Sequence, residues 1–205
     1  MPTQLELLNR TALAIQNPLF RFLEREVTVA SALLELVKSD LFMLIDMCKG
    51  NIKSTNMLKQ LAEDLHSDVI PKRWRKYTVA QITATIWVND FVRRVIQLQD
   101  LSKKPDFGQS GLWLGGLLFP EAYLTATRQS IAQKNNWSLE ELKMEFKINP
   151  TEEDLADNAS GFVLSGFSMQ GAEYSMTDES IKLTDSLGSN LPLVNVKWIH
   201  TSTVA

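Results

Sequence analysis

The chain has 205 residues and a formal net charge of −3, a length that suits one domain or two small ones. Its 44% hydrophobic and 22% charged content is ordinary for a globular protein, and the slight acidity excludes a general attraction to nucleic acid or anionic membranes. The single cysteine, Cys48, excludes an internal disulfide framework and fits a reducing, cytosolic setting. Because Cys48 follows an apolar helical pattern, we expect it to be buried.

Apolar spacing predicts that the first hundred residues are helical. Leu5, Leu8, Ala12 and Ile15 are spaced 3-4-3 and predict a first helix. Asn17-Pro18 ends that helix and begins the next, with Asn17 as the cap and Pro18 at the first helical position.

The second predicted helix carries the strongest pattern in the sequence. Its apolar residues alternate at spacings of four and three over about 25 residues, as in a coiled-coil seam. They are Leu23, Val27, Ala30, Leu34, Val37, Leu41, Leu44 and Cys48. Neighbouring apolar residues widen the stripe, which favours burial in a helix bundle over the alternative, a dimerising coiled coil. Gly50 is expected to end the helix, and Glu24-Arg25-Glu26 to form its solvent face or a rim of contacts to a neighbouring domain.

Two more helices are predicted before residue 102. The third runs from about Ser54 to Ile70 and stops at Pro71. The fourth opens with the capping box Thr78-Val-Ala-Gln81 and continues to about Leu101. Their expected apolar positions are Leu58, Leu61, Leu65 and Val69 in the third, and Val79, Ile82, Ile86, Val92 and Ile96 in the fourth.

The second half of the sequence mixes helix and strand signals. Pro120 begins a helix to about Lys134, and Ser138-Leu-Glu-Glu141 is a second capping box. Extended segments or strands are predicted at 112–119, around Met144, Phe146 and Ile148, and near 161–169, 180–184 and 193–199, with loops over 102–111 and 150–160.

Details within these strands follow from single residues. Gly115-Gly116 permits a bulge or a close backbone approach, and Gly161, Gly166 and Gly171 are expected at strand bends or turns. In the last strand, Val194, Val196 and Trp198 are expected on one face, with Asn195 and Lys197 on the other.

No combination of residues predicts catalysis. The two histidines, His66 and His200, are far apart in sequence, and no zinc-ligand or nucleophile motif occurs. The segment from Gly50 to Thr55 lacks the glycine that precedes the lysine of a phosphate-binding loop. It predicts a helix stop at Gly50 and a cap for the next helix at Ser54 or Thr55. We therefore expect no catalytic, cofactor-binding or metal-binding residue in this protein.

A basic cluster with interleaved aromatics, Lys72-Arg-Trp-Arg-Lys-Tyr77, is a candidate for contacts to phosphates and bases. The favoured interpretation is a turn between helices, anchored in the core by Trp74. Residues 71–104 carry a net charge of +6 and residues 151–190 a net of −7. Such opposite charges can steer docking within the protein or onto a larger partner. The residues predicted to form a docking surface are Lys72, Arg73, Arg75, Lys76, Glu152, Glu153 and Asp154.

Several segments, in order and over roughly residues 17–199, resemble the C-terminal region of dynein heavy chains. They are NPLFRFLEREV from Asn17, VIPKRW from Val69, Trp87 with Asp90-Phe91, GLWLGGLLFPEAYLTATRQ from Gly111, NNWSLEELKMEF from Asn135, GFVLSGFSMQGAEY from Gly161 and LPLVNVKWI from Leu191. The sequences of the segments LFRFLEREV and ATRQSIAQ resemble cytoplasmic dyneins more closely than axonemal dyneins.

This resemblance implies a non-catalytic accessory domain that packs on the AAA+ ring of the same heavy chain and tunes minus-end-directed microtubule motility, in processivity and force. ATP with Mg²⁺, microtubules and the other dynein subunits would engage other regions of the parent polypeptide, in the cytoplasm and on the cytoskeleton. We expect no binding of nucleic acid or membrane. The alternative is a stand-alone protein-interaction module that uses the heptad helix or the charged faces.

The predicted fold class is α+β. A helical subdomain of about four long helices is expected over residues 1–101, and a linker, apolar segment and helix over 102–142. A β-rich subdomain is expected over 143–205, resembling a small antiparallel barrel. The family's final strands do not follow Ala205, so the barrel is expected to be incomplete.

Overall fold

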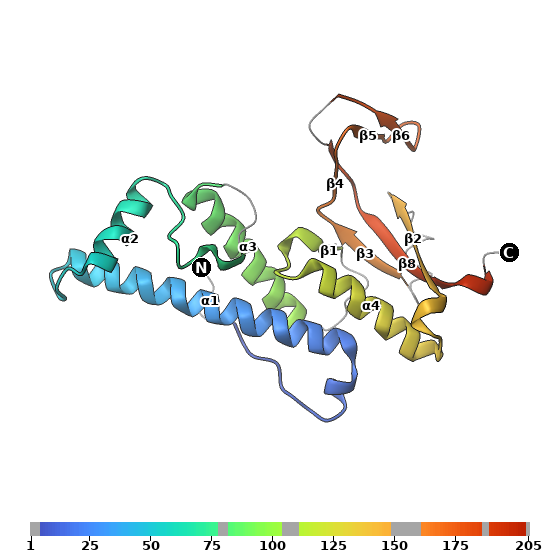
Figure 1. The fold of residues 1–205 in the computed structure, drawn as a ribbon, viewed down its shortest axis with the longest axis horizontal. Coiled ribbons are helices and arrows are strands. Elements are labelled where there is room, and N and C mark those ends of the chain that lie inside the picture. The colour runs from blue at the N-terminus through green and yellow to red at the C-terminus, as the bar shows by residue number, and fades with distance from the viewer. Residues whose placement is uncertain (1–4, 78–81, 104–110, 149–160, 186–188, 204–205) are drawn as a thin grey trace. The chain divides into compact units, whose positions relative to one another are not determined.

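The computed structural model describes residues 5–77, 82–103, 111–148, 161–185 and 189–203, and these form helices and sheets of an α+β protein (Figure 1). The fold class predicted from the sequence is thereby confirmed. The helices are α1 (Pro18–Cys48), α2 (Asn56–His66), α3 (Ala84–Lys103) and α4 (Pro120–Asn135). The strands are β1 (Leu112–Trp113), β2 (Leu142–Ile148), β3 (Gly161–Ser165), β4 (Ser168–Met169), β5 (Ala172–Ser175), β6 (Ser180–Leu183), β7 (Ser189–Asn190) and β8 (Val194–His200).

The protein divides into two compact units. The first comprises residues 1–9 and 24–102, and the second comprises residues 10–23 and 103–205. The division predicted from sequence, at residues 101 and 142, stays a prediction.

Helix α1 begins and ends where the sequence predicts. The Asn17 side chain accepts a hydrogen bond from the Leu19 amide at 3.0 Å, so it caps the helix ahead of Pro18. At the other end Gly50 adopts a φ of +77° and its amide donates to the Met47 carbonyl. A residue with a left-handed backbone just past the last turn is a common helix stop, and glycine adopts that conformation most easily.

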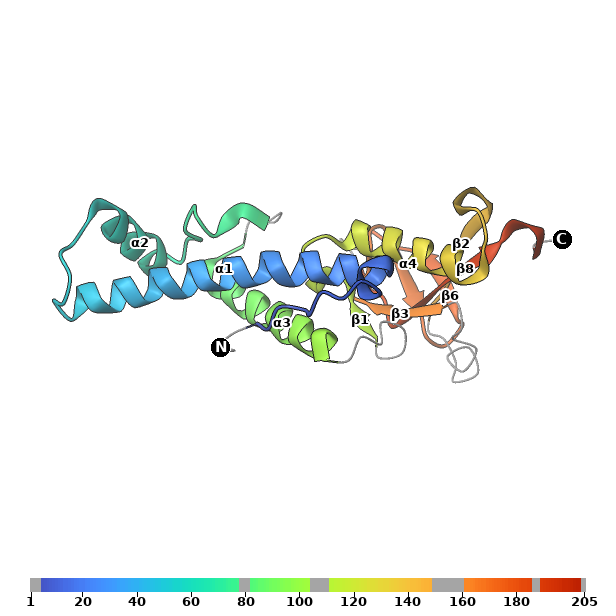
Figure 2. The ribbon, with the colours of Figure 1, turned by 90° about the horizontal axis from the view of Figure 1, so that it is seen from below.

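The first unit packs α2 and α3 against α1, and Figure 2 shows α3 running beside α1, as does Figure 1. The early positions of the heptad seam are buried, as predicted: Val27, Ala30, Leu34 and Val37. Leu58 and Leu61 are the buried residues of α2. Thr55 caps this helix by accepting a hydrogen bond from the Leu58 amide. Apolar contact between these helices therefore forms the core of the unit.

Three predictions in the first half of the sequence are wrong. Residues 5–13 form no helix, and only a short 3₁₀ turn covers Ala14–Gln16. Leu5 is buried while Ala12 and Ile15 are exposed, so the segment lacks the packed face that a short helix requires. Cys48 is exposed because the seam becomes exposed toward the end of α1. Glu26 is fully buried rather than on a solvent face.

The buried face of α3 also differs from the prediction. Its buried residues are Ala84, Trp87, Phe91, Val95, Leu98 and Leu101, whereas Ile86 and Ile96 are about half exposed. Trp87 stacks on both Trp74 and Phe91, with ring centroids 5.6 and 5.0 Å apart. Burial of these large rings outweighs burial of the isoleucines and fixes the rotation of the helix. The predicted capping box, Thr78–Gln81, lies outside the described residues.

The second unit is built on a four-stranded sheet in the order β1-β3-β8-β2. Strand β8 pairs antiparallel with both β2 and β3, as predicted for the β-rich segment. Strand β1 comes from the mixed segment before it and pairs parallel with β3. Two further two-stranded sheets, β4–β7 and β5–β6, complete the described strands, and no closed barrel forms among them. Strands β5 and β7 were not predicted.

Helix α4 lies along one face of the four-stranded sheet (Figures 1 and 2). The Trp198 indole donates to the Thr127 hydroxyl at 3.0 Å, and Tyr123 packs edge-on against Phe22 and Phe162. Val194, Val196 and Trp198 are buried on β8 as predicted, but Asn195 on the other face is also buried. Side chains on both faces of β8 are thus buried.

Gly166 shows why the strand predicted over 161–169 is split in two. Its φ is +85°, and a Cβ there would lie 2.4 Å from Cδ1 of Trp113. Only glycine permits this close approach, so the backbone bends between β3 and β4. The prediction that Gly166 and Gly171 occupy turn positions is confirmed, since Gly171 also has a positive φ.

Candidate functional site

The basic segment Lys72–Tyr77 is anchored in the first unit by its tryptophan. Trp74 is 1% exposed and its indole N–H donates to Oδ2 of the buried Asp40 at 2.9 Å. The interpretation of this segment as an inter-helix turn with a core anchor is therefore confirmed. A buried indole cannot stack on a base, so Trp74 is not available to a nucleic-acid site.

The two arginines among the predicted docking residues contact their own unit. Arg73 Nη1 lies 2.6 Å from Oδ1 of Asp40, and Arg75 Nε donates to the Ile70 carbonyl at 2.7 Å. Lys72 and Lys76 are exposed. Arg73 and Arg75 therefore hold the turn in place.

The acidic half of the predicted docking surface, Glu152, Glu153 and Asp154, lies outside the described residues. The docking surface as a whole stays a prediction.

The two histidines have ordinary surroundings. His66 is exposed in the last turn of α2. His200 lies near Ser202 Oγ at 2.6 Å and Glu141 Oε2 at 3.3 Å, beside the Trp137 ring. Within the described ranges, no group of three or more His, Cys, Asp or Glu side chains is placed to hold a metal ion. In the same ranges, no helix combines the length and the apolar character that crossing a membrane requires.

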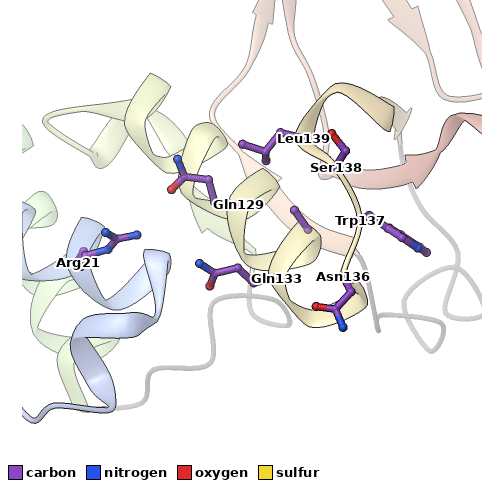
Figure 3. Close-up of a pocket in the computed structure, with 8 residues that line it drawn as sticks. Arg21, Gln129, Gln133, Asn136, Trp137, Ser138 and Leu139 are labelled. Carbon is purple, nitrogen blue, oxygen red and sulfur yellow. The ribbon is translucent and has the colours of Figure 1, made fainter.

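An open hollow of about 580 Å³ lies in the second unit, between the start of α1 and the end of α4 (Figure 3). Local structure shapes one wall of the hollow. Asn136 has the left-handed backbone that ends α4, and Ser138 and Glu141 then form the predicted capping box, which is confirmed. The lining residues are Arg21, Gln129, Ala132, Gln133, Asn136, Trp137, Ser138 and Leu139.

The lining of the hollow combines hydrogen-bond donors with an apolar wall. Among the described residues that line it, Arg21 is the charged one, and Figure 3 shows Arg21, Gln129 and Gln133 on facing sides of the space. Amides and a guanidinium donate to carboxylates, and the Trp137 ring and Leu139 offer apolar surface. The hollow therefore offers hydrogen-bonding groups beside apolar surface. Sequence reasoning missed it, because its residues come from two helices and a turn.

Comparison with known proteins identifies the class to which this fold belongs. The family described as the C-terminal domain of the dynein heavy chain matches residues 1–205. The protein belongs to this family.

Individual relatives show which dynein heavy chains this sequence resembles most. The cytoplasmic dynein heavy chain of Paramecium tetraurelia is 43% identical over 98% of this sequence, and that of Drosophila melanogaster is 40% identical over 98%. A ciliary dynein beta chain of the sea urchin Tripneustes gratilla is 30% identical over 74% of this sequence. The 205 residues span about 4% of the length of each of these relatives. The similarity is thus higher to the cytoplasmic heavy chains, as the sequence motifs indicated.

Proposed function

We propose that this protein is the C-terminal accessory domain of a cytoplasmic dynein heavy chain, and that it packs on the AAA+ ring formed by the rest of that heavy chain. There it tunes minus-end-directed movement along microtubules, chiefly processivity and force. The observation that carries the proposal is the 43% identity to a cytoplasmic heavy chain over almost the whole of this sequence.

The proposed mechanism is mechanical. A helix of 31 residues such as α1 is about 46 Å long, which is sufficient to reach across more than one element of a neighbouring domain. Its buried apolar positions hold the helix in its unit, and the Asn17 cap limits fraying of its first turn. Such a helix can restrain the relative motion of the parts that it touches.

We expect no catalysis and no cofactor in this domain. In the parent motor, ATP and Mg²⁺ would be held by the AAA+ ring, and microtubules and other dynein subunits would bind other regions. The proposal places the parent motor in the cytoplasm on the cytoskeleton. It includes no contact of this domain with nucleic acid or membrane.

A domain replacement tests this function. Three versions of the Paramecium heavy chain would be compared: the native protein, a version lacking the matched segment, and a version in which this sequence replaces that segment. We expect deletion to change run length and stall force more than ATP turnover, and replacement to restore both. Replacement motors that carry a folded domain yet behave like the deletion would refute the proposal.

A second candidate function, a stand-alone protein-interaction module, is favoured by one feature of the first unit. Phe42 is 65% and Ile45 47% exposed on the last turns of α1, so this end of the helix offers apolar surface beside the seam. This function predicts that the isolated protein binds a partner through these residues. Loss of binding in a Phe42→Ser variant, with the motor properties of the parent heavy chain unchanged, would favour it over the first proposal.

A further inference from the structure

The hairpin of β5 and β6 has one apolar face. The cross-strand pairs Ala172–Leu183 and Tyr174–Ile181 place all four side chains on the same side, because paired residues and alternate residues share a face. The pair Glu173–Lys182 lies on the opposite face, where Lys182 also forms an ion pair with Asp178. The hairpin is therefore amphipathic.

The apolar face is exposed. Leu183 is 93% and Ile181 54% exposed, whereas Tyr174 and Ala172 are partly covered. In the described part of the protein, β5 and β6 pair with each other and form a sheet of their own, which Figure 1 shows as a separate ribbon. A two-stranded sheet is only marginally stable in water without packing on one face. An exposed apolar face on such a hairpin is typical of one that packs against another surface.

The size of this face decides what kind of surface covers it. A stable complex between separate chains uses about 20–30 residues on each side, and this face offers four side chains. A face of that size is too small to hold two copies of the protein together by itself. It is sufficient where the partner is tethered, because a segment joined by a short flexible connection is present at an effective concentration of about millimolar.

The heavy-chain relatives supply such a tethered partner, since this sequence spans about 4% of their length. We propose that the apolar face of the β5–β6 hairpin packs against an apolar segment of the same heavy chain that lies outside these 205 residues. This inference rests on the proposed function and adds to it the element that makes the contact.

Photo-crosslinking in the intact heavy chain tests the contact. Benzoylphenylalanine would be placed at Leu183 in one version and at Lys182 in the other. The two positions are adjacent in sequence, both are exposed, and they face opposite sides of the hairpin, so position 182 is the matched control. Because Leu183 is almost fully exposed, its replacement does not disturb a core. Crosslinked peptides would be identified by mass spectrometry, with differently tagged heavy chains mixed to separate contacts within one molecule from contacts between molecules.

We expect position 183 to crosslink to a single segment of the same heavy chain and position 182 to give only background. Equal yields from both positions, crosslinks between the two tagged molecules, or no crosslink from position 183 would each overturn the inference. The motility comparison above is independent of this result. A motor that needs the domain yet gives no crosslink at 183 would refute the hairpin contact and leave the proposed function standing.

Discussion

Replacing Asp40 by alanine is expected to destabilise the first unit substantially. The carboxylate is fully buried and accepts hydrogen bonds from Arg73 at 2.6 Å and from the Trp74 indole at 2.9 Å. It therefore fixes the turn after α2 against the middle of α1. Its removal leaves a buried indole N–H without an acceptor, which costs about 1–3 kcal/mol.

The contribution of Arg73 is smaller than its short distance suggests. Removing one partner of a fully buried ion pair costs about 3–5 kcal/mol, but the Arg73 side chain is 47% exposed. Water can solvate the guanidinium once the carboxylate is gone, so that range is an upper bound. We expect Asp40→Ala to lower the free energy of unfolding by about 2–3 kcal/mol. For a protein of this size that corresponds to a fall in melting temperature of about 4–12 °C.

Asp90 provides the matched control. It pairs with Arg94 at the same 2.6 Å, but one helical turn away and with both side chains partly exposed. Such pairs contribute about 0.3–0.5 kcal/mol, so Asp90→Ala is expected to change stability by less than about 0.5 kcal/mol. Urea denaturation followed by far-UV circular dichroism would measure both variants. Equal, small effects of Asp40→Ala and Asp90→Ala would refute the reasoning, because burial would then not distinguish the two aspartates.

Three further predictions concern glycine and pH. Gly166→Ala is expected to lower the free energy of unfolding by about 2–4 kcal/mol, because the backbone is left-handed and a Cβ would lie 2.4 Å from the Trp113 ring. Gly50→Ala is expected to lower it by only about 1 kcal/mol, because nothing lies within 4 Å of a Cβ there. Equal losses for the two variants in urea denaturation would contradict this. Hydrogen bonds from the Thr85 amide and hydroxyl hold the pKa of Asp68 below its usual value. The stabilisation is thus present above the unfolded pKa of about 4 and is lost as pH falls through the folded pKa; Asp68→Asn should flatten the acid limb of stability against pH. Burial raises the pKa of Tyr123. The contribution of the neutral Tyr123 side chain to stability is therefore complete below the unfolded pKa of about 10 and declines above it. An absorbance titration that shows all three tyrosines ionising near pH 10 in the folded protein would contradict this.

Local signals in the sequence were sufficient to place several helix ends, although α2 ends at His66 and not at the predicted Ile70. Asn17-Pro18, Gly50, Thr55 and Pro120 occupy the predicted ends of helices, and the capping box at Ser138 forms. These signals act through hydrogen bonds or backbone preferences within about four residues, so they can be read without knowledge of the fold. The α+β class and the family follow in the same way from periodicity and from motif order.

Tertiary structure decided which surfaces are buried. Ile86 and Ile96 have the apolar spacing of a core face, yet the stack of Trp74, Trp87 and Phe91 takes that place. The carboxylate of Asp40 is buried because a tryptophan and an arginine more than thirty residues away supply its hydrogen bonds. Strand β5 was not predicted from the sequence, and only the register of β5 and β6 places Leu183 and Ile181 on one exposed face. Such contacts join residues that are distant in sequence, and the free energy of burial depends on the partner side chains that only folding brings together.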